Sequence, residues 1–338
     1  MCLISYHFHR QLPNTSAIES QTMLRQNEWS LGLVMLLGVV ILWVLSSFLV
    51  DGIFKDDLYS KPFLITYLNT SVFVLYLIPY HFYKQVLPSD ALTHRETSVL
   101  AAKFCLLWFL SNLVNNASLL YTSVSNQTIL SSTSSFFTLL VCWIVGIDTI
   151  SRIKLTGLVL SFVGVLLINY KTDAISAHPL WGNVLALLGA VCYGVYSAML
   201  KLKAINFGNI NMRLFFGYVG IYNTLFVWPL LVVLHLTGLE TLEMPHGSTT
   251  WKLLAVNCFI SFIADFLWAN ATLLTSPLTV TVGLSLTIPI AMVGDWVFRQ
   301  RATSVLYVLS AMLILVSFII INREEEKVEV DEQREEDA

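Results

Sequence analysis

The sequence predicts an all-α integral membrane protein with about ten transmembrane helices, arranged as two inverted repeats of five helices each. Of its 338 residues 56% are hydrophobic and only 12% are charged, and the mean hydropathy is +0.71. Soluble domains carry about 25% charged residues, so most of this surface does not face water. The apolar runs are about twenty residues long, which favours helices over the ten-residue alternating strands of a barrel.

About ten apolar segments are long enough to cross a hydrocarbon core of about 30 Å. We expect the ninth segment to begin at the turn of Ser276 and Pro277, because proline suits the first position of a helix. The segments lie near residues 30–50, 62–82, 99–121, 126–146, 153–170, 180–200, 212–236, 250–273, 278–298 and 303–322. The chain thus divides into a polar tail (1–28), a first five-helix repeat (29–171), a second five-helix repeat (172–322) and an acidic tail (323–338).

The charges outside the segments predict the orientation. Thirteen of the 19 Lys and Arg residues fall on the side of the two tails. Cytoplasmic loops carry the excess of Lys and Arg, so both termini are predicted to be cytoplasmic. The acidic tail should be solvated and disordered.

An internal repeat supports the division into halves. A shift of 153 residues places Thr122–Asn169 on Thr275–Asn322 without a gap, and Trp143 then meets Trp296. Because each half has an odd number of spans, the second half must enter the membrane in the opposite sense. Inverted repeats that meet near the membrane midplane permit alternating access, so the pattern predicts a secondary transporter.

The clearest candidate for a functional side chain is Asp265, which lies in the middle of the eighth segment. A lone carboxylate there is costly unless it is protonated, paired or facing water. It could bind a solute or a coupling proton, or form a structural pair with Lys201 or an Asn. Trp268 follows three residues later on the same helix face.

Other polar and aromatic residues of the spans could line the same cavity or hold helices together. Aromatic rings beside a carboxylate suit a flat or cationic organic solute, through stacking and cation–π attraction. Trp29 and Trp181, near span ends, are instead interpreted as interfacial aromatic residues. The remaining candidates for solute binding are Trp43, Ser47, Trp108, Asn112, Asn116, Ser132, Tyr193, Tyr196, Lys201 and Ser285.

Ser132 has a simpler interpretation than solute binding, because it lies in a run of small hydroxyl residues that permits close helix packing. Pro289, in the ninth segment, is a separate candidate for a hinge. Pro289 should free the carbonyl of Ser285, four residues earlier, and so acts either as a hinge or as a passive kink.

Several classes of function are disfavoured. The five cysteines show no CxxC spacing and are interpreted as buried apolar side chains. The seven histidines are dispersed, so neither a metal site nor an enzyme is expected. No Gly-Lys-Ser/Thr phosphate loop is present, and no cofactor is expected. The net charge of −3 comes without a basic stripe, so nucleic acid is not an expected partner.

Several runs carry a family resemblance, namely 61–71, 107–112, 129–139, 216–220, 284–289 and Trp228-Pro229. They resemble the drug/metabolite transporter (EamA-like) superfamily, and more narrowly solute carrier family 35 subfamily F with its fungal members. The resemblance covers roughly residues 28–322 and implies ten spans, an inverted repeat and transport without ATP hydrolysis. Asp265-Phe266-Leu267-Trp268 matches an acidic position of this branch.

The leading hypothesis is transport of a small organic solute, such as a cationic vitamin like thiamine, with H⁺ as a candidate coupling ion. The alternative is a nucleotide-sugar or nucleotide exchanger, which would need cationic groups in the cavity. Lys201 and Lys203 are the obvious candidates for that role. Membrane lipid is the expected surrounding, and a homodimer is an alternative to a monomer. Fungal relatives favour the vacuolar membrane, with the Golgi and mitochondrial membranes as alternatives.

Overall fold

The computed structural model is all-helical over the residues that it describes. These are 15–56, 61–78, 92–121, 130–169, 179–207, 210–238, 240–243, 245, 247–290 and 305–336. Within these residues, five stretches are long and apolar enough to cross a membrane, and the apolar helices at Pro62–Tyr76, Leu130–Ile144 and Pro277–Ile290 are shorter. The predicted class, an all-α integral membrane protein, is confirmed. The long stretches are Asn27–Ser46, His94–Asn115, Leu180–Asn206, Met212–Thr237 and Ser248–Leu274.

The helices begin and end at residues suited to those positions. Asn211 caps α9 by accepting from the Leu214 amide, and Gly238 ends α10 with a φ of 71°. Ser276 caps α12, which opens with Pro277 as predicted. The elements are α1 (Thr15–Asp56), α2 (Pro62–Ser71), η1 (Val72–Tyr76), α4 (His94–Tyr121), α6 (Ser134–Ile144), α7 (Arg152–Asn169), α8 (Pro179–Phe207), α9 (Met212–Phe226), α10 (Trp228–Thr237), α11 (Ser248–Leu274), α12 (Pro277–Leu284) and α14 (Val305–Glu336).

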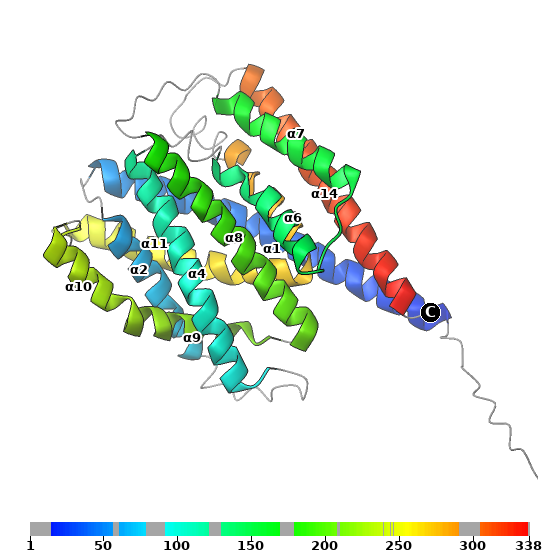
Figure 1. Cartoon of the computed structure of the whole chain (residues 1–338), viewed down its shortest axis with the longest axis horizontal. Helices are drawn as coiled ribbons and strands as arrows, with labels where there is room; N and C mark the ends of the chain where they lie inside the picture. The colour runs from blue at the N-terminus through cyan, green and yellow to red at the C-terminus, as the bar shows by residue number, and fades with distance from the viewer. Residues whose placement is uncertain are drawn as a thin grey trace, which may run out of the picture.

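Three close helix pairs organise the bundle: α1 with α11, α4 with α8, and α7 with α14. In Figure 1, α7 and α14 run side by side along one edge of the molecule. The shorter helices α6 and α12 pack on each other, and α6 also packs on α8. The largest group of buried side chains lies where α1, α4, α8, α9 and α11 meet.

Two glycines of α7 allow α14 to approach closely. A Cβ atom on Gly157 would collide with Ile321, and one on Gly164 would collide with Ile314. Ser317 also donates a hydrogen bond of 2.7 Å to the Gly157 carbonyl. Small residues promote such close contacts between membrane helices. The later glycine of α7 faces the earlier isoleucine of α14, so the two helices are antiparallel.

The expectation of a disordered acidic tail is wrong over the residues that the structure describes. Helix α14 continues past Asn322 to Glu336 without interruption. Glu325 is buried, at 5% exposure, and its carboxylate lies 2.5 Å from the ammonium of Lys154 on α7. The burial of Glu325 follows from the antiparallel packing of α7 on α14, because this packing places the first turn of the acidic tail beside the start of α7. At the other end of the chain, α1 already begins at Thr15, within the polar tail.

The start of α1 and the end of α14 lie at the same end of the bundle (Figure 1). Trp29 Nε1 donates to Asn322 Oδ1 at 3.1 Å, and Trp29 is 3% exposed. The interpretation of Trp29 as an interfacial residue is therefore wrong, because its indole is enclosed between two helices. Trp181 is 67% exposed on α8, as expected for a side chain at the lipid interface.

Gly220 gives a direct test of the packing of α9 on η1. A Cβ atom there would lie 2.7 Å from the Phe73 carbonyl carbon, a backbone atom that cannot swing aside. We expect Gly220→Ala to destabilise the detergent-purified protein by about 1–3 kcal/mol, seen as a lower Tm. Gly247→Ala is the control, because its nearest neighbour is a side-chain oxygen of Thr250 at 3.3 Å. Equal melting temperatures for both variants would contradict the packing.

Candidate functional site

The candidate site centres on Asp265 in the middle of α11. The side chain is buried, at 7% exposure, and accepts a hydrogen bond from the indole of Trp43 on α1. One turn earlier on α11, the Phe262 carbonyl accepts a hydrogen bond from the Tyr76 hydroxyl. The close pairing of α1 with α11 thus places a carboxylate, which is expensive to bury, beside an indole donor and aromatic rings.

An aromatic cluster borders Asp265. We use this name for Phe104 and Trp108 of α4, Tyr193 and Tyr196 of α8, and Trp268 of α11. Trp268 is fully buried, and its Nε1 donates to the Tyr193 hydroxyl at 2.8 Å. Its ring centroid lies 5.5 Å from those of both Trp108 and Tyr196. Such spacings are typical of favourable aromatic pairs, and the rings join three helices around one point.

The carboxylate and the rings form one electrostatic unit. The Asp265 carboxylate interacts electrostatically with the hydroxyl groups of Tyr76, Tyr193 and Tyr196. Six residues predicted for the site from sequence therefore lie together: Asp265 and Trp268 of α11, Tyr193 and Tyr196 of α8, Trp43 of α1 and Trp108 of α4.

Other predicted residues are placed differently. Asn112 donates to the Trp108 carbonyl of its own helix at 2.8 Å. Ser132 is helical and directly precedes the turn at Thr133, and its carbonyl accepts from the Ser135 hydroxyl. Ser285 lies in the turn after α12 and is buried. The side chains of Ser47 and Asn116 lie outside the part of the chain that the structure describes.

Lys201 is bound at a helix end. Its ammonium donates to the Leu273 carbonyl at 2.9 Å and to the Thr275 carbonyl at 2.5 Å, and the residue is 9% exposed. A cation at the C-terminal end of α11 satisfies carbonyls that have no partner in the helix and complements the helix dipole. The structural role considered for Lys201 from the sequence was a pair with Asp265. These contacts give it a structural role through backbone carbonyl groups instead.

The predicted effect of Pro289 needs correction. The helix is interrupted one turn earlier, at Ser285 and Leu286, and residues 287–290 are helical again. The Ser285 carbonyl is not freed, because it accepts from the Ile288 amide at 3.2 Å. A matching interruption occurs at Thr133, before α6, where no proline stands at the corresponding position. Proline is therefore not the cause that the two interruptions share.

A second group of polar residues was missed from the sequence. Asn257 of α11 is fully buried; its Oδ1 accepts from Ser46 at 2.6 Å, and its Nδ2 donates to Asn69 at 3.2 Å. Ser261 lies between Asn257 and Asp265 on the same helix face. Polar residues at positions 257, 261 and 265, four residues apart, could have indicated this group from the sequence. Together they extend the polar face of α11 toward α2.

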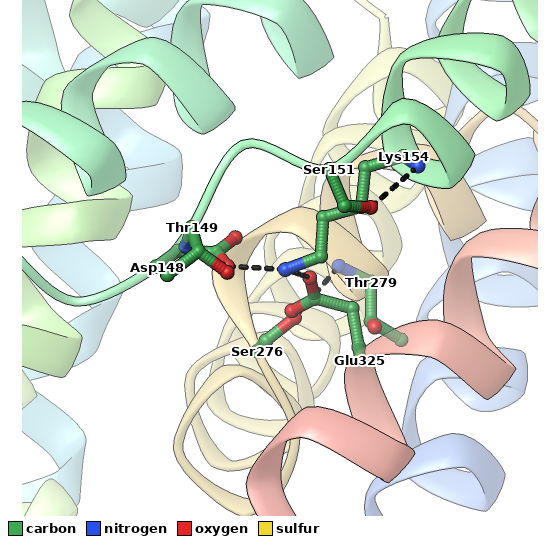
Figure 2. Close-up of polar contacts among 7 residues, drawn as sticks. All are labelled: Asp148, Thr149, Ser151, Lys154, Ser276, Thr279 and Glu325. Carbon is green, nitrogen blue, oxygen red and sulfur yellow. Dashed lines mark hydrogen bonds and ion pairs between the residues drawn. The ribbon is translucent and has the colours of Figure 1, made fainter.

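A cluster of charged residues, shown in Figure 2, lies apart from the aromatic rings. Lys154 is fully buried and pairs with Asp148 and with Glu325. The cluster therefore has two carboxylates for one ammonium group. Burial and the nearby Asp148 carboxylate raise the pKa of Glu325 above its ordinary value.

The cysteines behave as apolar side chains. Cys105, Cys142, Cys192 and Cys258 are free and buried, which confirms the prediction for these four. Cys2 lies outside the described residues. In the described part of the chain, no group of three or more His, Cys, Asp or Glu side chains could hold a metal ion.

The chain is similar in sequence to proteins of one transporter family. The sequence profile of the EamA-like transporter family matches residues 30–170. An uncharacterised vacuolar membrane protein of Saccharomyces cerevisiae is 43% identical, covering 88% of this chain and 91% of its own length. The thiamine-repressible mitochondrial transport protein of the same yeast is 39% identical, covering 89% and 94%. Solute carrier family 35 member F5 of Macaca fascicularis is 34% identical, covering 68% and 54%.

The fold is also similar to a solved one. A protein crystal structure that is 13% identical superposes with a TM-score of 0.64 and covers 89% of this chain and 99% of its own. At this identity the similarity concerns the arrangement of the helices alone.

Substitution of Lys201 separates a structural role from a solute-binding role. We expect Lys201→Met to lower the Tm, corresponding to a loss of roughly 2–4 kcal/mol, because two charge-assisted hydrogen bonds disappear. Lys252→Met is the control, since Lys252 is exposed on α11. An unchanged Tm for Lys201→Met, together with a weaker solute affinity, would show that the ammonium serves the solute instead.

Proposed function

The chain belongs to the EamA-like transporter family, in the branch of solute carrier family 35 subfamily F and its fungal relatives, and on this premise we propose that it is a secondary transporter. It moves a small organic solute across an intracellular membrane by alternating access. The solute binds beside Asp265, between the α1–α11 pair and the α4–α8 pair. The burial of this carboxylate next to five aromatic rings is the observation that carries the proposal.

Alternating access requires two halves that can exchange roles, and the helix contacts support such a pair. We pair the helices of the two halves in chain order, so that α1, α2, α4, α6 and α7 correspond to α8, α9, α11, α12 and α14. The contact between α1 and α11 then has its counterpart in the contact between α8 and α4. The contact of α4 with α9 likewise corresponds to that of α11 with α2. The pairs α2–α9, α6–α12 and α7–α14 each join corresponding helices. This pattern is what ten spans in two inverted repeats produce.

The interruptions at Thr133 and at Ser285–Leu286 support the same proposal. A shift of 153 residues brings Ser132 onto Ser285 and Thr133 onto Leu286. Each interruption leaves a helix in two segments that can reorient separately. Broken helices at corresponding positions of two repeats are a common feature of transporter binding sites.

The chemistry around Asp265 suits a flat, cationic organic solute. A carboxylate compensates a positive charge, and indole and phenol rings attract both cations and heteroaromatic rings. Thiamine is an example of this class. In the absence of solute, a proton on Asp265 removes the cost of burying the charge, so H⁺ is the proposed coupling ion.

The alternative of a nucleotide-sugar exchanger has less support. Such a solute carries phosphate groups, which would need cationic side chains in the cavity. Lys201 is bound to the carbonyls of Leu273 and Thr275. The carboxylate of Asp265 would also repel a phosphate.

The membrane in which the protein acts is proposed from its relatives. One yeast relative is named as a vacuolar membrane protein and another as a mitochondrial transport protein. The vacuolar relative is the more similar of the two, at 43% against 39% identity, so we favour the vacuolar membrane.

Asp265→Asn tests the proposed role of the carboxylate. We expect solute uptake by proteoliposomes to fall about tenfold or more, because the amide keeps the shape but can neither carry a charge nor exchange a proton. The Tm should stay close to that of the wild type. Glu243→Gln is the control, since that side chain is 60% exposed and distant from the aromatic cluster along the chain. Unimpaired uptake by Asp265→Asn would refute the role.

Competition between solutes separates the two classes of substrate. Proteoliposomes should accumulate labelled thiamine without ATP when a proton gradient is imposed. Unlabelled thiamine should compete with it, whereas UDP- and GDP-sugars should not, because Asp265 attracts cations and repels phosphate. Uptake of labelled nucleotide sugars with no uptake of thiamine would favour the exchanger instead.

A further inference from the structure

The charged cluster of Asp148, Lys154 and Glu325 joins three parts of the chain at one end of the bundle (Figure 2). Asp148 lies in the connection between α6 and α7, Lys154 on the first turn of α7, and Glu325 on α14. The Lys154 side chain has no exposed surface, and those of Asp148 and Glu325 are 9% and 5% exposed. Buried charges of this kind are held only where each has a partner.

A fourth segment is attached through Ser276. The Ser276 side chain interacts with the Glu325 carboxylate, and its hydroxyl accepts from the Thr279 amide at 3.0 Å, so it caps α12 at the same time. Glu325 thus lies at the N-terminal end of α12, where the helix dipole favours a negative charge. The charged cluster ties α7 and α14 to the turn between α11 and α12.

This turn is the end of the helix that carries Asp265. It is packed on its other side against α1, because a Cβ atom on Gly32 would lie 2.6 Å from Thr275. Lys201 of α8 binds the carbonyls of the same turn. Any movement of this turn away from α7 must therefore break a contact of Glu325, either that with Ser276 or that with Lys154.

The charged cluster belongs to one end of the molecule. Under the shift of 153 residues, the position of Lys154 corresponds to Tyr307 and that of Asp148 to Arg301. The second half therefore has neither this lysine nor this aspartate at the matching positions. The charged cluster lies on the side of the bundle near Trp29 and Asn322. The positions that correspond to Asp148 and Lys154 in the second repeat do not carry the same residues.

We propose that the charged cluster is a latch, which closes the end of the transporter where α1 begins and α14 ends. The extension of α14 past Asn322 is the part that separates from the rest when this end opens. Opening at this end separates Glu325 from Lys154 and Ser276 and lets the α11–α12 turn move away from α7. The proposal rests on the alternating access proposed above. It gives the acidic extension a role in setting which side of the membrane the site faces.

A native cysteine beside the latch reports its opening. Cys142 of α6 is 1% exposed and interacts electrostatically with Asp148, Lys154 and Glu325. Cys258 of α11 is also buried but belongs to the polar group around Asn69.

The full-length protein in liposomes is treated with a small water-soluble thiol reagent, and the labelled peptides are identified by mass spectrometry. The rates of labelling at Cys142 and Cys258 are then compared.

We expect Glu325→Gln to raise the rate at Cys142 by about tenfold or more and to leave the rate at Cys258 unchanged or lower, because opening is confined to one end. Glu326→Gln, a neighbouring acid on the same helix, should leave both rates unchanged. Ser276→Ala, which removes one contact and no charge, should give a smaller increase at Cys142.

Two results would overturn the latch. One is an unchanged rate at Cys142 in both Glu325→Gln and Ser276→Ala. The other is an equal increase at both cysteines, which would mean that the charged cluster only stabilises the fold. The labelling needs no solute, so its outcome is separate from that of the uptake assays. Absence of uptake for every solute would refute the proposed function, while the labelling would still decide whether this end opens.

Discussion

The burial of Asp265 between α1 and α11 is the constraint around which the centre of this molecule is organised. An unpaired carboxylate in a membrane helix is costly, and here the Trp43 indole of α1 supplies a hydrogen-bond donor. Aromatic side chains of α4 and α8 then fill the remaining space. The close pairing of α1 with α11 and of α4 with α8 therefore defines both the packing and the candidate site.

Much of this could be read from the sequence, because the signals are local. The length of the apolar runs predicted the helices, and the Ser276-Pro277 turn predicted the start of one of them. Asp265 was recognised as a candidate because it is an acidic residue within an apolar segment. The spacing of Asp265 and Trp268 correctly placed both on one face. Tyr193, Tyr196 and Trp108 were named only as aromatic residues of other spans that could line the same cavity or hold helices together.

The features that could not be predicted from the sequence have a common cause, since each depends on contacts between distant residues or with the backbone. Lys201 binds carbonyl groups, which leave no mark in the sequence. Glu325 sits in a run of acids typical of a solvated tail, and its burial depends on a lysine far away in the first half. The interruption at Ser285 was assigned to Pro289, yet the matching interruption at Thr133 has no proline. These are effects of helix packing rather than of local sequence.

The two halves share a fold but differ in charge, with Asp265 in the second half and the buried Lys154 in the first. Proton counting by calorimetry, in two buffers of different ionisation enthalpy, tests the central claim that Asp265 receives the solute. The account predicts that binding of a cationic solute releases about one proton per molecule from the wild type and none from Asp265→Asn. The same release from both proteins, or none from the wild type, would contradict it.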